Sequence, residues 1–509
     1  MVDETMGRDA DLSEEAFDID GAGRRSATFV SRRKFLRMGI IGSAMASAAI
    51  MTRDAKAATE FLSSRVRSQR VTAGTGLVKA GPELALPPGF SYTTFGHFGS
   101  AMSDGFITPP IHDGMGVFPA SNDTYRIVRN HELGEGNDIP AGTVIGVPDT
   151  AYDPKSPGGC TTMIVDSHGA LLEHFISING TNTNCAGAPT PWGTWLTMEE
   201  TVTGVKAGNR KAHGYVFEVD AYADGPVKRR PLRGMGRMLH EAGAVDPVTG
   251  VVYMTEDEGP DGFYRYVPSV HADLAAGGVL QMLKVVGERK YNTIVGQTVG
   301  ESLPVRWVTI DEPDPADAED DPSALFRQGR RKGAAKFLGG EGATWVDRDD
   351  SVAFDSSDGG DAGLGQIWRY KPTTRRGEID ERGTLTLLYE STDEARLDGP
   401  DNLATSPNGA ILIAEDGDIE SNFVRALLPD GTLINVAENL VGVQFHYIEA
   451  SGKLYDPTVP DDGASAGDGI GHSEFAGPRF SPDGKWLFVN IQVPGITCAI
   501  TGPWEDLGL

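Results

Sequence analysis

Short apolar runs separated by turn residues limit, more than any other feature, the folds open to this chain. The segments TYRIVRN (124–130), GVVYMTED (250–257) and KWLFVNIQV (485–493) are rich in aromatic and β-branched residues, and turn-forming residues bound each one. Helical periodicity is scarce along the chain. The 65 glycines and 31 prolines among 509 residues fit many tight turns. These features together predict an all-β protein.

A degenerate repeat organises these runs. The turns at 246–250 (DPVTG), 406–409 (SPNG) and 481–484 (SPDG) each lead into an apolar strand, and 346–354 is a fourth, weaker copy. The copies lie roughly 60 to 100 residues apart, which fits propeller blades with loop insertions better than a sandwich. In a propeller, the innermost strand of each blade converges on a central channel.

An acidic residue stands shortly before the turn of each copy: Glu241, Glu341, Asp401 and Glu474. If these positions are equivalent, the carboxylates gather near the axis at one end of the propeller. Carboxylates at close range raise one another's pKa or require cations. The pattern therefore predicts a central funnel that binds metal ions. The alternative is that each acid only caps its own turn.

The N-terminal region has the pattern of an export signal. The segment SRRKFL (31–36) precedes an apolar run at about 38–51, and AKA (55–57) follows as a cleavage site. Adjacent arginines followed by Phe-Leu match the twin-arginine pattern, and the apolar run is too short to span a membrane comfortably. We therefore expect a twin-arginine (Tat) signal peptide over 1–57, export by the Tat translocase and a periplasmic or secreted protein with no stable membrane anchor.

The remainder of the chain is expected to hold a polar lead-in at 58–83 and a single propeller domain at 84–509. The formal net charge is −27, and such a surface repels nucleic acid. Three cysteines, Cys160, Cys185 and Cys498, cannot form a disulfide scaffold. No long heptad pattern is present, so we expect a monomer.

The segment NCAGAPTPWGTWLTMEE (184–200) carries the densest signal. Its Gly, Pro and Trp content indicates a tightly packed loop that runs into a strand, and Cys185 and Glu200 flank it. A thiolate with carboxylates suits iron or zinc, whereas carboxylates with carbonyls suit calcium. On composition alone, Cys185 is more often a small buried residue than a ligand.

The ordered series of motifs resembles the PhoX-type alkaline phosphatases over nearly the whole mature chain. Besides 184–200, the series comprises LPPGFSYTTFG (86–96), DGM (113–115), RNHE (129–132), HEAGAVDPVTGVVYMTED (240–257), DGPDNLA (398–404), EDGD (415–418) and FAGPRFSPDGKWLFVNIQ (475–492). The resemblance implies a six-bladed β-propeller with iron and calcium at the axis, and hydrolysis of small phosphate esters.

The resemblance also implies which residues form the site. Cys185 matches the family's iron-ligating cysteine, and Glu200 matches a metal-ligating glutamate. The full set of predicted ligands for Fe³⁺ and Ca²⁺ is Cys185, Glu200, Glu241, Glu341, Asp401, Glu415 and Asp418. Catalytic roles are predicted for Glu200, His240 and Glu341, although a single histidine is more often a structural hydrogen-bonder.

One position departs from the family pattern. Phosphatase members usually carry an Arg two residues before the Glu that aligns with Glu341, and Gly339 stands there in this chain. An Arg at that place can clamp phosphate with a fork of donors. Lys336, Arg331 and Arg265 are the candidates to compensate. No G-x-S-x-G elbow and no convincing Ser-His-Asp set offers another nucleophile.

Two other functions therefore stay open. A calcium-dependent propeller lactonase or related esterase would bind calcium without iron and would give Cys185 no role. A non-catalytic periplasmic propeller with structural calcium would hydrolyse no ester.

Overall fold

The computed structural model of the protein describes residues 67–68, 75–121, 123–134, 145–228, 230–373, 379, 381–417, 421–444 and 470–509. All of them belong to the second of two units, Met1–Ile40 and Ile41–Leu509. The predicted signal peptide at 1–57 and the predicted ligand Asp418 lie outside the described residues.

Strands make up almost all of the regular structure in the described part of the chain. The α-helix described there is α3 (Ala324–Arg331), and short 3-10 turns occur at Pro148–Thr150, Arg233–Met235, Leu274–Ala276 and Trp504–Leu507. No helix in the described ranges is long and apolar enough to cross a lipid bilayer.

Two antiparallel sheets follow one another in the first half of the chain. The first contains β5 (His112–Pro119), β6 (Thr124–His131), β7 (Gly158–Asp166) and β8 (Leu171–Thr181). The second contains β9 (Asn184–Pro189), β10 (Thr194–Glu199) and β11 (Val216–Asp220).

A nine-stranded sheet occupies the middle of the chain. Its spatial order is β12 (His240–Val245), β13 (Val252–Glu256), β14 (Tyr264–Pro268), β15 (Gly278–Val285), β16 (Ser302–Thr309), β20 (Arg382–Glu390), β19 (Gln366–Pro372), β18 (Ser351–Ser356) and β17 (Ala343–Val346).

The last sheets combine strands from both ends of the described chain. One contains β2 (Val78–Lys79), β3 (Leu84–Leu86), β24 (Leu433–Asn439), β23 (Phe423–Leu427), β22 (Ile411–Glu415) and β21 (Pro400–Thr405). Another contains β27 (Phe475–Phe480), β28 (Leu487–Ile491), β29 (Ile496–Thr501) and β4 (Ser91–Phe95). A small sheet contains β1 (Arg67–Ser68), β25 (Val441–Gln444) and β26 (Ile470–His472).

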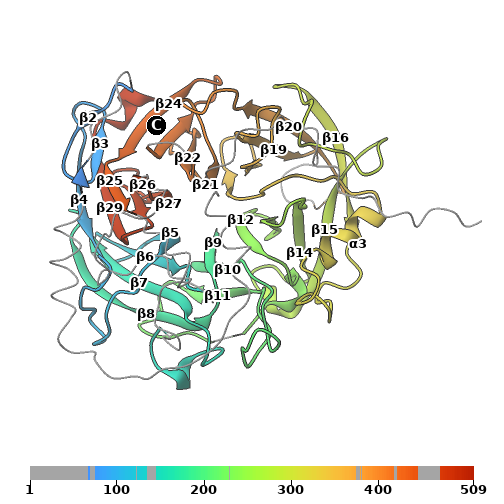
Figure 1. The fold of residues 1–509 in the computed structure, drawn as a ribbon, viewed down its shortest axis with the longest axis horizontal. Helices are drawn as coiled ribbons and strands as arrows, with labels where there is room; N and C mark the ends of the chain where they lie inside the picture. The colour runs from blue at the N-terminus through green and yellow to red at the C-terminus, as the bar shows by residue number, and fades with distance from the viewer. Residues whose placement is uncertain are drawn as a thin grey trace, which may run out of the picture. The chain divides into compact units, whose positions relative to one another are not determined.

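The innermost strands of these sheets surround a common axis (Figure 1). β5 contacts β9, β9 contacts β12, and the contacts continue through β17, β21 and β27 back to β5. A closed ring of sheets whose inner strands face one axis is a β-propeller. The predicted fold class is therefore confirmed.

The sheets do not correspond one to one with propeller blades. β16 pairs with β20 over Ser302–Arg306, so β12–β15 and β17–β20 share one continuous sheet. Hydrogen bonding therefore does not separate six blades, although six inner strands line the axis in the part of the chain that the structure describes. The number of blades stays a prediction.

The ring is closed by strands that are distant in sequence. β4 pairs with β29, with Thr497 opposite Phe95 and Thr501 opposite Ser91, and β3 pairs with β24. The expected boundary between lead-in and propeller, at 83/84, falls between β2 and β3, which pair with each other.

Apolar side chains fill the space between neighbouring sheets. Between β12–β15 and β17–β20, Phe263 stacks on Phe354 with ring centroids 3.9 Å apart, and both rings are about 1% exposed. Alternate residues of a strand point to opposite faces of its sheet, so each face that meets a neighbouring sheet contributes side chains to such a core. This packing fixes the positions of the inner strands around the axis.

Candidate metal centre

The side chains at the axis come from one end of the inner strands. Asp113, Cys185, Glu241 and Asp401 each occupy the second position of their strand, in β5, β9, β12 and β21. Inner strands of a propeller run in the same direction along the axis, so their first residues meet at the same end. Three further acids lie beside other strands. Glu132 follows β6, Glu200 follows β10, and Glu341 shortly precedes β17.

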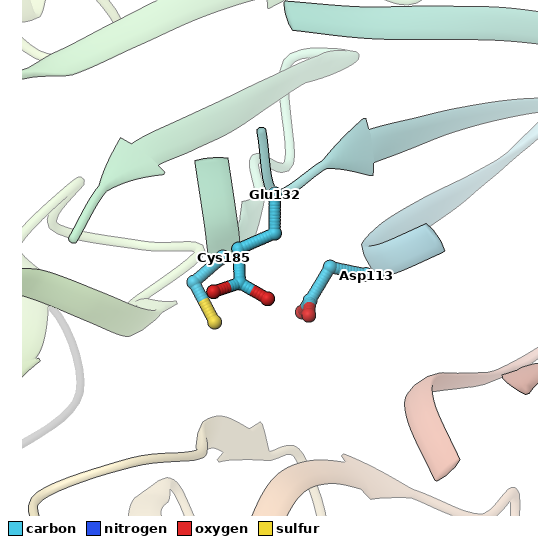
Figure 2. Close-up of side chains that lie close together, drawn as sticks. All are labelled: Asp113, Glu132 and Cys185. Carbon is cyan, nitrogen blue, oxygen red and sulfur yellow. The ribbon is translucent and has the colours of Figure 1, made fainter. Parts of the chain in front are cut away.

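These side chains form three overlapping groups. In each group, one potential ligand atom from every residue lies within 4.8 Å of the others; the groups are Asp113 with Glu132 and Cys185, Cys185 with Glu200 and Glu241, and Glu241 with Glu341 and Asp401. Figure 2 shows the first group, in which the three side chains converge. Because Cys185 and Glu241 each belong to two groups, the three groups form one continuous cluster, which we call the axial cluster.

The axial cluster is buried except at Glu200, which is half-buried, and its charges oppose one another. Burial raises the pKa of Glu241 well above its usual range, and the nearby Glu341 and Glu200 carboxylates raise it further. Burial, followed by the Asp257 and Glu132 carboxylates, has the same effect on the pKa of Glu200. Burial and then the Asp113 carboxylate raise the pKa of the Cys185 thiol. The ionised forms therefore need compensating positive charge.

Glu241 shows most directly that a cation fits the cluster. Its side chain is 0% exposed, and neither carboxylate oxygen has a hydrogen-bond partner. A buried carboxylate without donors is costly unless it is protonated or binds a metal ion. One thiol among several carboxylates is a donor set that suits metal ions, with iron or zinc favoured beside the thiol and calcium beside carboxylates alone.

Amide side chains hold the acids in place. The Gln492 amide nitrogen donates to Asp113 Oδ2 over 2.8 Å and to Glu132 Oε2 over 2.9 Å. The Asn402 amide donates to Asp401 Oδ1 over 2.7 Å, and Ser357 Oγ donates to Glu341 Oε1 over 3.2 Å. Hydrogen bonds of this kind orient metal ligands.

Glycines let the inner strands approach closely enough for the cluster to form. A Cβ on Gly342 would lie 2.1 Å from the Asp401 carbonyl oxygen, and a Cβ on Gly114 would lie 2.6 Å from the Ala186 Cα. No other residue fits at such separations without a shift of the backbone. Next to the acids on the inner strands, residues including Gly114, Ala242, Asn402 and Arg479 line a small gap.

Of the predicted ligands, five come together in the axial cluster: Cys185, Glu200, Glu241, Glu341 and Asp401. Glu415 is placed differently, because its Oε1 accepts a hydrogen bond from Arg425 Nε over 2.8 Å and its Oε2 accepts one from the Phe423 amide over 2.9 Å. Burial raises the pKa of Glu415 to about 7 although Arg425 opposes the rise. Glu415 is thus engaged by Arg425 and belongs to none of the three groups.

His240 also lies outside the three groups. Its Nε2 lies 3.0 Å from the Gly236 carbonyl oxygen, so this nitrogen carries a proton, and Nδ1 has no hydrogen-bond partner. Burial lowers the pKa of His240 to about 4. The imidazole is therefore neutral at physiological pH, and Nδ1 offers a lone pair.

Sequence reasoning missed Asp113 and Glu132 as site residues. Both lie in motifs that carried the family resemblance, DGM and RNHE, but neither belongs to the turn repeat that drew attention to the other acids. Asp113 and Glu132 lie on either side of the opposed pair His112 and His131 of β5 and β6, where the register of the two strands shifts between His112 and Met115, and only the folded chain brings their carboxylates to Cys185.

The departure at Gly339 has a structural cause. Gly339 has a φ of 65°, and a Cβ there would lie 2.3 Å from Ser357 Oγ. An Arg at this position would be strained at this φ and would have to displace the Ser357 hydroxyl. Of the three candidates to compensate, Arg265 donates to Gln281 over 2.7 Å and lies over the Trp307 ring, which engages its guanidinium elsewhere.

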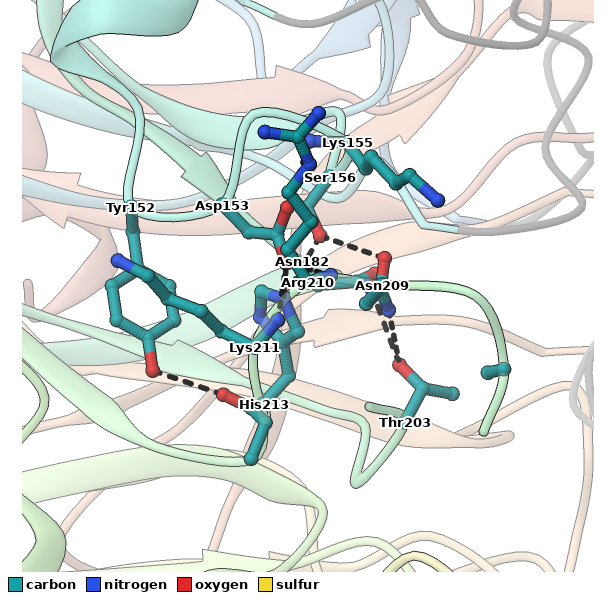
Figure 3. Close-up of polar contacts among 12 residues, drawn as sticks. Tyr152, Asp153, Lys155, Ser156, Asn182, Thr203, Asn209, Arg210, Lys211 and His213 are labelled. Carbon is teal, nitrogen blue, oxygen red and sulfur yellow. Dashed lines mark hydrogen bonds and ion pairs between the residues drawn. The ribbon is translucent and has the colours of Figure 1, made fainter. Parts of the chain in front are cut away.

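A second buried polar network contains a serine, a histidine and an acid in hydrogen-bonded order. Ser156 Oγ lies 2.9 Å from His213 Nε2, and His213 Nδ1 lies 2.7 Å from Glu199 Oε1. Ser156 also donates to Asn209 Oδ1 over 3.2 Å, and Asp153 accepts backbone hydrogen bonds from Lys155 and Lys211 (Figure 3). The arrangement resembles a nucleophile, base and acid set.

The charge state of His213 argues against nucleophilic catalysis in this network. Burial alone would lower the pKa of His213, but the Glu199 and Asp153 carboxylates outweigh burial and raise the pKa to about 9. At neutral pH both ring nitrogens therefore donate, and Ser156 accepts rather than loses a proton. Ser156 is also 0% exposed. The network is structural.

Comparison with known proteins adds a family and a fold. The sequence profile of the family described as alkaline phosphatase PhoX matches residues 73–173 and 168–495. No curated protein sequence matches the chain. A solved structure of Pseudomonas fluorescens PhoX in complex with vanadate, a transition state analogue, superposes with a TM-score of 0.60 at 17% identity, over 87% of this chain and 98% of that one.

Two gluconolactonases give weaker matches. The protein from Xanthomonas campestris has a TM-score of 0.36 at 10% identity, over 86% of this chain and 97% of that one. The periplasmic gluconolactonase of Pseudomonas aeruginosa has a TM-score of 0.34 at 14% identity, over 79% of this chain and 89% of that one.

Proposed function

Since this chain belongs to the alkaline phosphatase PhoX family and is by that membership a phosphoric ester hydrolase, we propose that it cleaves small phosphate esters at the axial cluster with the help of bound iron and calcium. The observation that carries this proposal is the continuity of the cluster, in which Cys185 and Glu241 each join two groups of ligand atoms. A site of this kind could hold more than one cation, and phosphoryl transfer needs chiefly positioning and charge stabilisation.

The donor types suggest how the ions would be distributed. Asp113, Glu132 and Cys185 offer a thiolate with two carboxylates, which suits iron, and Glu241, Glu341 and Asp401 offer oxygen alone, which suits calcium. When bound, such ions would offset the charge of the phosphoryl oxygens and activate water for in-line attack.

The chain's own residues have positioning roles in this proposal. Gln492 keeps Asp113 and Glu132 together through two hydrogen bonds from one amide nitrogen. Ser357 orients Glu341, one of the predicted catalytic carboxylates. His240 is neutral and donates from Nε2 to the Gly236 carbonyl oxygen, so we assign it an orienting role rather than a proton-donating one.

We further propose that the protein acts outside the cytoplasm as a monomer. The twin-arginine pattern at 31–36 and the AKA site at 55–57 support export through the Tat translocase. This route carries proteins already folded, so a metal centre assembled in the cytoplasm would survive export.

The test combines elemental analysis of the purified, exported protein with a p-nitrophenyl phosphate assay, with and without added calcium. Iron and calcium in the parent protein, with calcium-dependent phosphate release, are expected. In Cys185→Ala, iron should fall to background and hydrolysis should fall by about 100-fold or more, because a ligand shared by two groups is lost. Cys498→Ala is the matched control, since Cys498 is also buried but lies in the apolar core around β29.

Two outcomes would overturn the proposal. Calcium without iron and without phosphate release would direct attention to lactone substrates. Unchanged iron content in Cys185→Ala would remove Cys185 from the ligand set.

A further inference from the structure

A second charged site lies between the sheet β5–β8 and the sheet β27–β29 with β4. Arg129 of β6 is 0% exposed. Its Nη1 donates to the Gly96 carbonyl oxygen over 3.1 Å and to Thr497 Oγ1 over 2.7 Å. Its Nε and Nη2 have no hydrogen-bond partner. No carboxylate among the described residues forms an ion pair with Arg129.

An unpaired guanidinium in this position requires compensation. Burial lowers the pKa of Arg129 to about 9, so the guanidinium still carries its charge at neutral pH and does not escape the cost of burial by becoming neutral. A buried charge is normally paired or bound to a counter-ion, and an unsatisfied buried group in a native structure calls for an ordered water or ion.

Two other buried arginines show how this chain satisfies a guanidinium elsewhere. Arg425 faces the Glu415 carboxylate, with Nε 2.8 Å from Oε1. Arg237 donates from Nε to the His213 carbonyl oxygen and from Nη2 to the Val202 carbonyl oxygen, over 2.8 and 2.9 Å. The same two nitrogens, Nε and Nη2, are the ones left without partners on Arg129.

The surroundings of Arg129 contain polar nitrogen atoms and neutral rings. His112 and His131 pack edge to face with ring centroids 5.2 Å apart. His112 Nδ1 and His174 Nε2 are buried and, like the Arg129 nitrogens, have no hydrogen-bond partner. Burial, followed by the positive charge of Arg129, lowers the pKa of all three histidines, so the guanidinium is the fixed charge of this region.

The region is closely packed. A Cβ on Gly96 would lie 3.0 Å both from Arg129 Nη1 and from Met163 Sδ. Adjacent strand residues point to opposite faces, and Asn130 accordingly contacts the Cys185 carbonyl oxygen while Arg129 contacts Thr497. This region is therefore on the other face of β6 from the strand that carries Cys185.

From these contacts we propose that Arg129 forms a buried site for a small inorganic anion of the chloride class. The anion accepts hydrogen bonds from Arg129 Nε and Nη2. The charge is balanced because one monovalent anion neutralises one guanidinium. A monatomic anion of single charge needs only these two donors, whereas a phosphate would bring more charge and more oxygen atoms than the two nitrogens can satisfy. The bound anion would help to hold the β5–β8 sheet, which carries Arg129, against the sheet of β27–β29 and β4, which carries Thr497.

The primary test uses the parent protein and bromide as the probe. Crystals grown in sodium bromide and measured at the bromine absorption edge should show an anomalous peak within hydrogen-bond distance of Arg129 Nε and Nη2. An ordered water there, with no anomalous peak, would overturn the proposal. This measurement does not depend on any variant's folding and is independent of the activity at the axial cluster.

A second measurement uses thermal unfolding at constant ionic strength. Replacing sodium gluconate by sodium bromide should raise the unfolding midpoint of the parent protein, because an ion that binds only the folded state stabilises it. The increase should vanish in Arg129→Met and persist in Arg425→Met, in which the removed guanidinium already has a carboxylate partner. An equal bromide response in the parent and in Arg129→Met would contradict the assignment.

Discussion

At the scale of single residues, the axial cluster depends on side chains that are not themselves ligands. Asp113 and Glu132 repel each other when ionised, yet one amide nitrogen of Gln492 donates to both. Gln492 is 1% exposed, so solvent does not replace these hydrogen bonds when they are lost.

We therefore expect Gln492→Ala to weaken metal binding. Loss of an orienting group costs about 10- to 100-fold in metal affinity, and the measurement is retained iron and calcium after dialysis against a graded series of chelator concentrations. Gln281→Ala is the control, since Gln281 is also buried but accepts from Arg265 instead. Equal retention in the two variants would show that Gln492 does not position the ligands.

His213 should make folding stability depend on pH. Its pKa of about 9 in the folded state lies above the unfolded value of 6.5, so its contribution is complete below about pH 6.5 and is lost as pH rises through about 9. The difference corresponds to about 3 kcal/mol. Denaturant unfolding of the parent and of His213→Gln should therefore give free energies that differ at pH 6 and converge by pH 9.5.

The same variant tests whether the Ser156 network is catalytic. Folded His213→Gln should retain p-nitrophenyl phosphate hydrolysis at pH 8, because the network is structural. A loss of more than about 100-fold with unchanged metal content would instead indicate that His213 acts in the reaction.

At the scale of elements, the spacing of the inner strands decides whether the ligands meet. β17 and β21 approach each other where Gly342 faces the Asp401 carbonyl oxygen, and the Gly342 amide donates to that oxygen over 2.8 Å. Glu341 and Asp401, which belong to the same group of ligand atoms, lie beside this contact.

Gly342→Ala should therefore separate these two strands. We expect a loss of stability of about 1–3 kcal/mol from overpacking and a lower calcium content, measured by denaturant unfolding and by elemental analysis. Gly225→Ala serves as the control, because no atom lies within 4 Å of a Cβ at that position. Normal calcium content in Gly342→Ala would mean that the strands tolerate the shift.

At the scale of the whole molecule, the axial cluster joins strands from most of the ring. Its members come from β5, β9, β12 and β21 and from the segments after β6 and β10 and before β17. Bound cations would relieve the mutual repulsion of these carboxylates, so metal binding and the closure of the ring should stabilise each other.

Removal of the metals should accordingly destabilise the entire propeller. A chelator at pH 8 is expected to lower the midpoint of thermal unfolding as a single cooperative transition, and calcium with iron should restore it. The measurement is differential scanning calorimetry of treated and restored samples. An unchanged midpoint after verified loss of both metals would show that the ions contribute nothing to ring closure.

The sequence by itself determined the fold class and most of the cluster. Alternating apolar residues bounded by Gly, Pro and Asp define strands through local chemistry. The turn repeat placed Glu241, Glu341, Asp401 and Glu474 at equivalent positions, and the first three of these belong to the axial cluster whereas Glu474 belongs to none of its groups. The motif at 184–200 identified Cys185 and Glu200 through its resemblance to a family. These signals lie within short stretches of chain, so no tertiary contact is needed to detect them.

Only the tertiary structure decided which acids share a space. Glu415 and Asp401 both lie in motifs that carry the family resemblance, but Arg425 on the neighbouring strand β23 pairs with Glu415. Asp113 and Glu132 join Cys185 because β5 and β9 are adjacent inner strands. The pairing of β16 with β20 likewise joins segments that are far apart in sequence. The same holds for the surroundings of Arg129, whose guanidinium keeps two nitrogens without partners. Pairing across such separations depends on how whole sheets pack, and no local pattern records it.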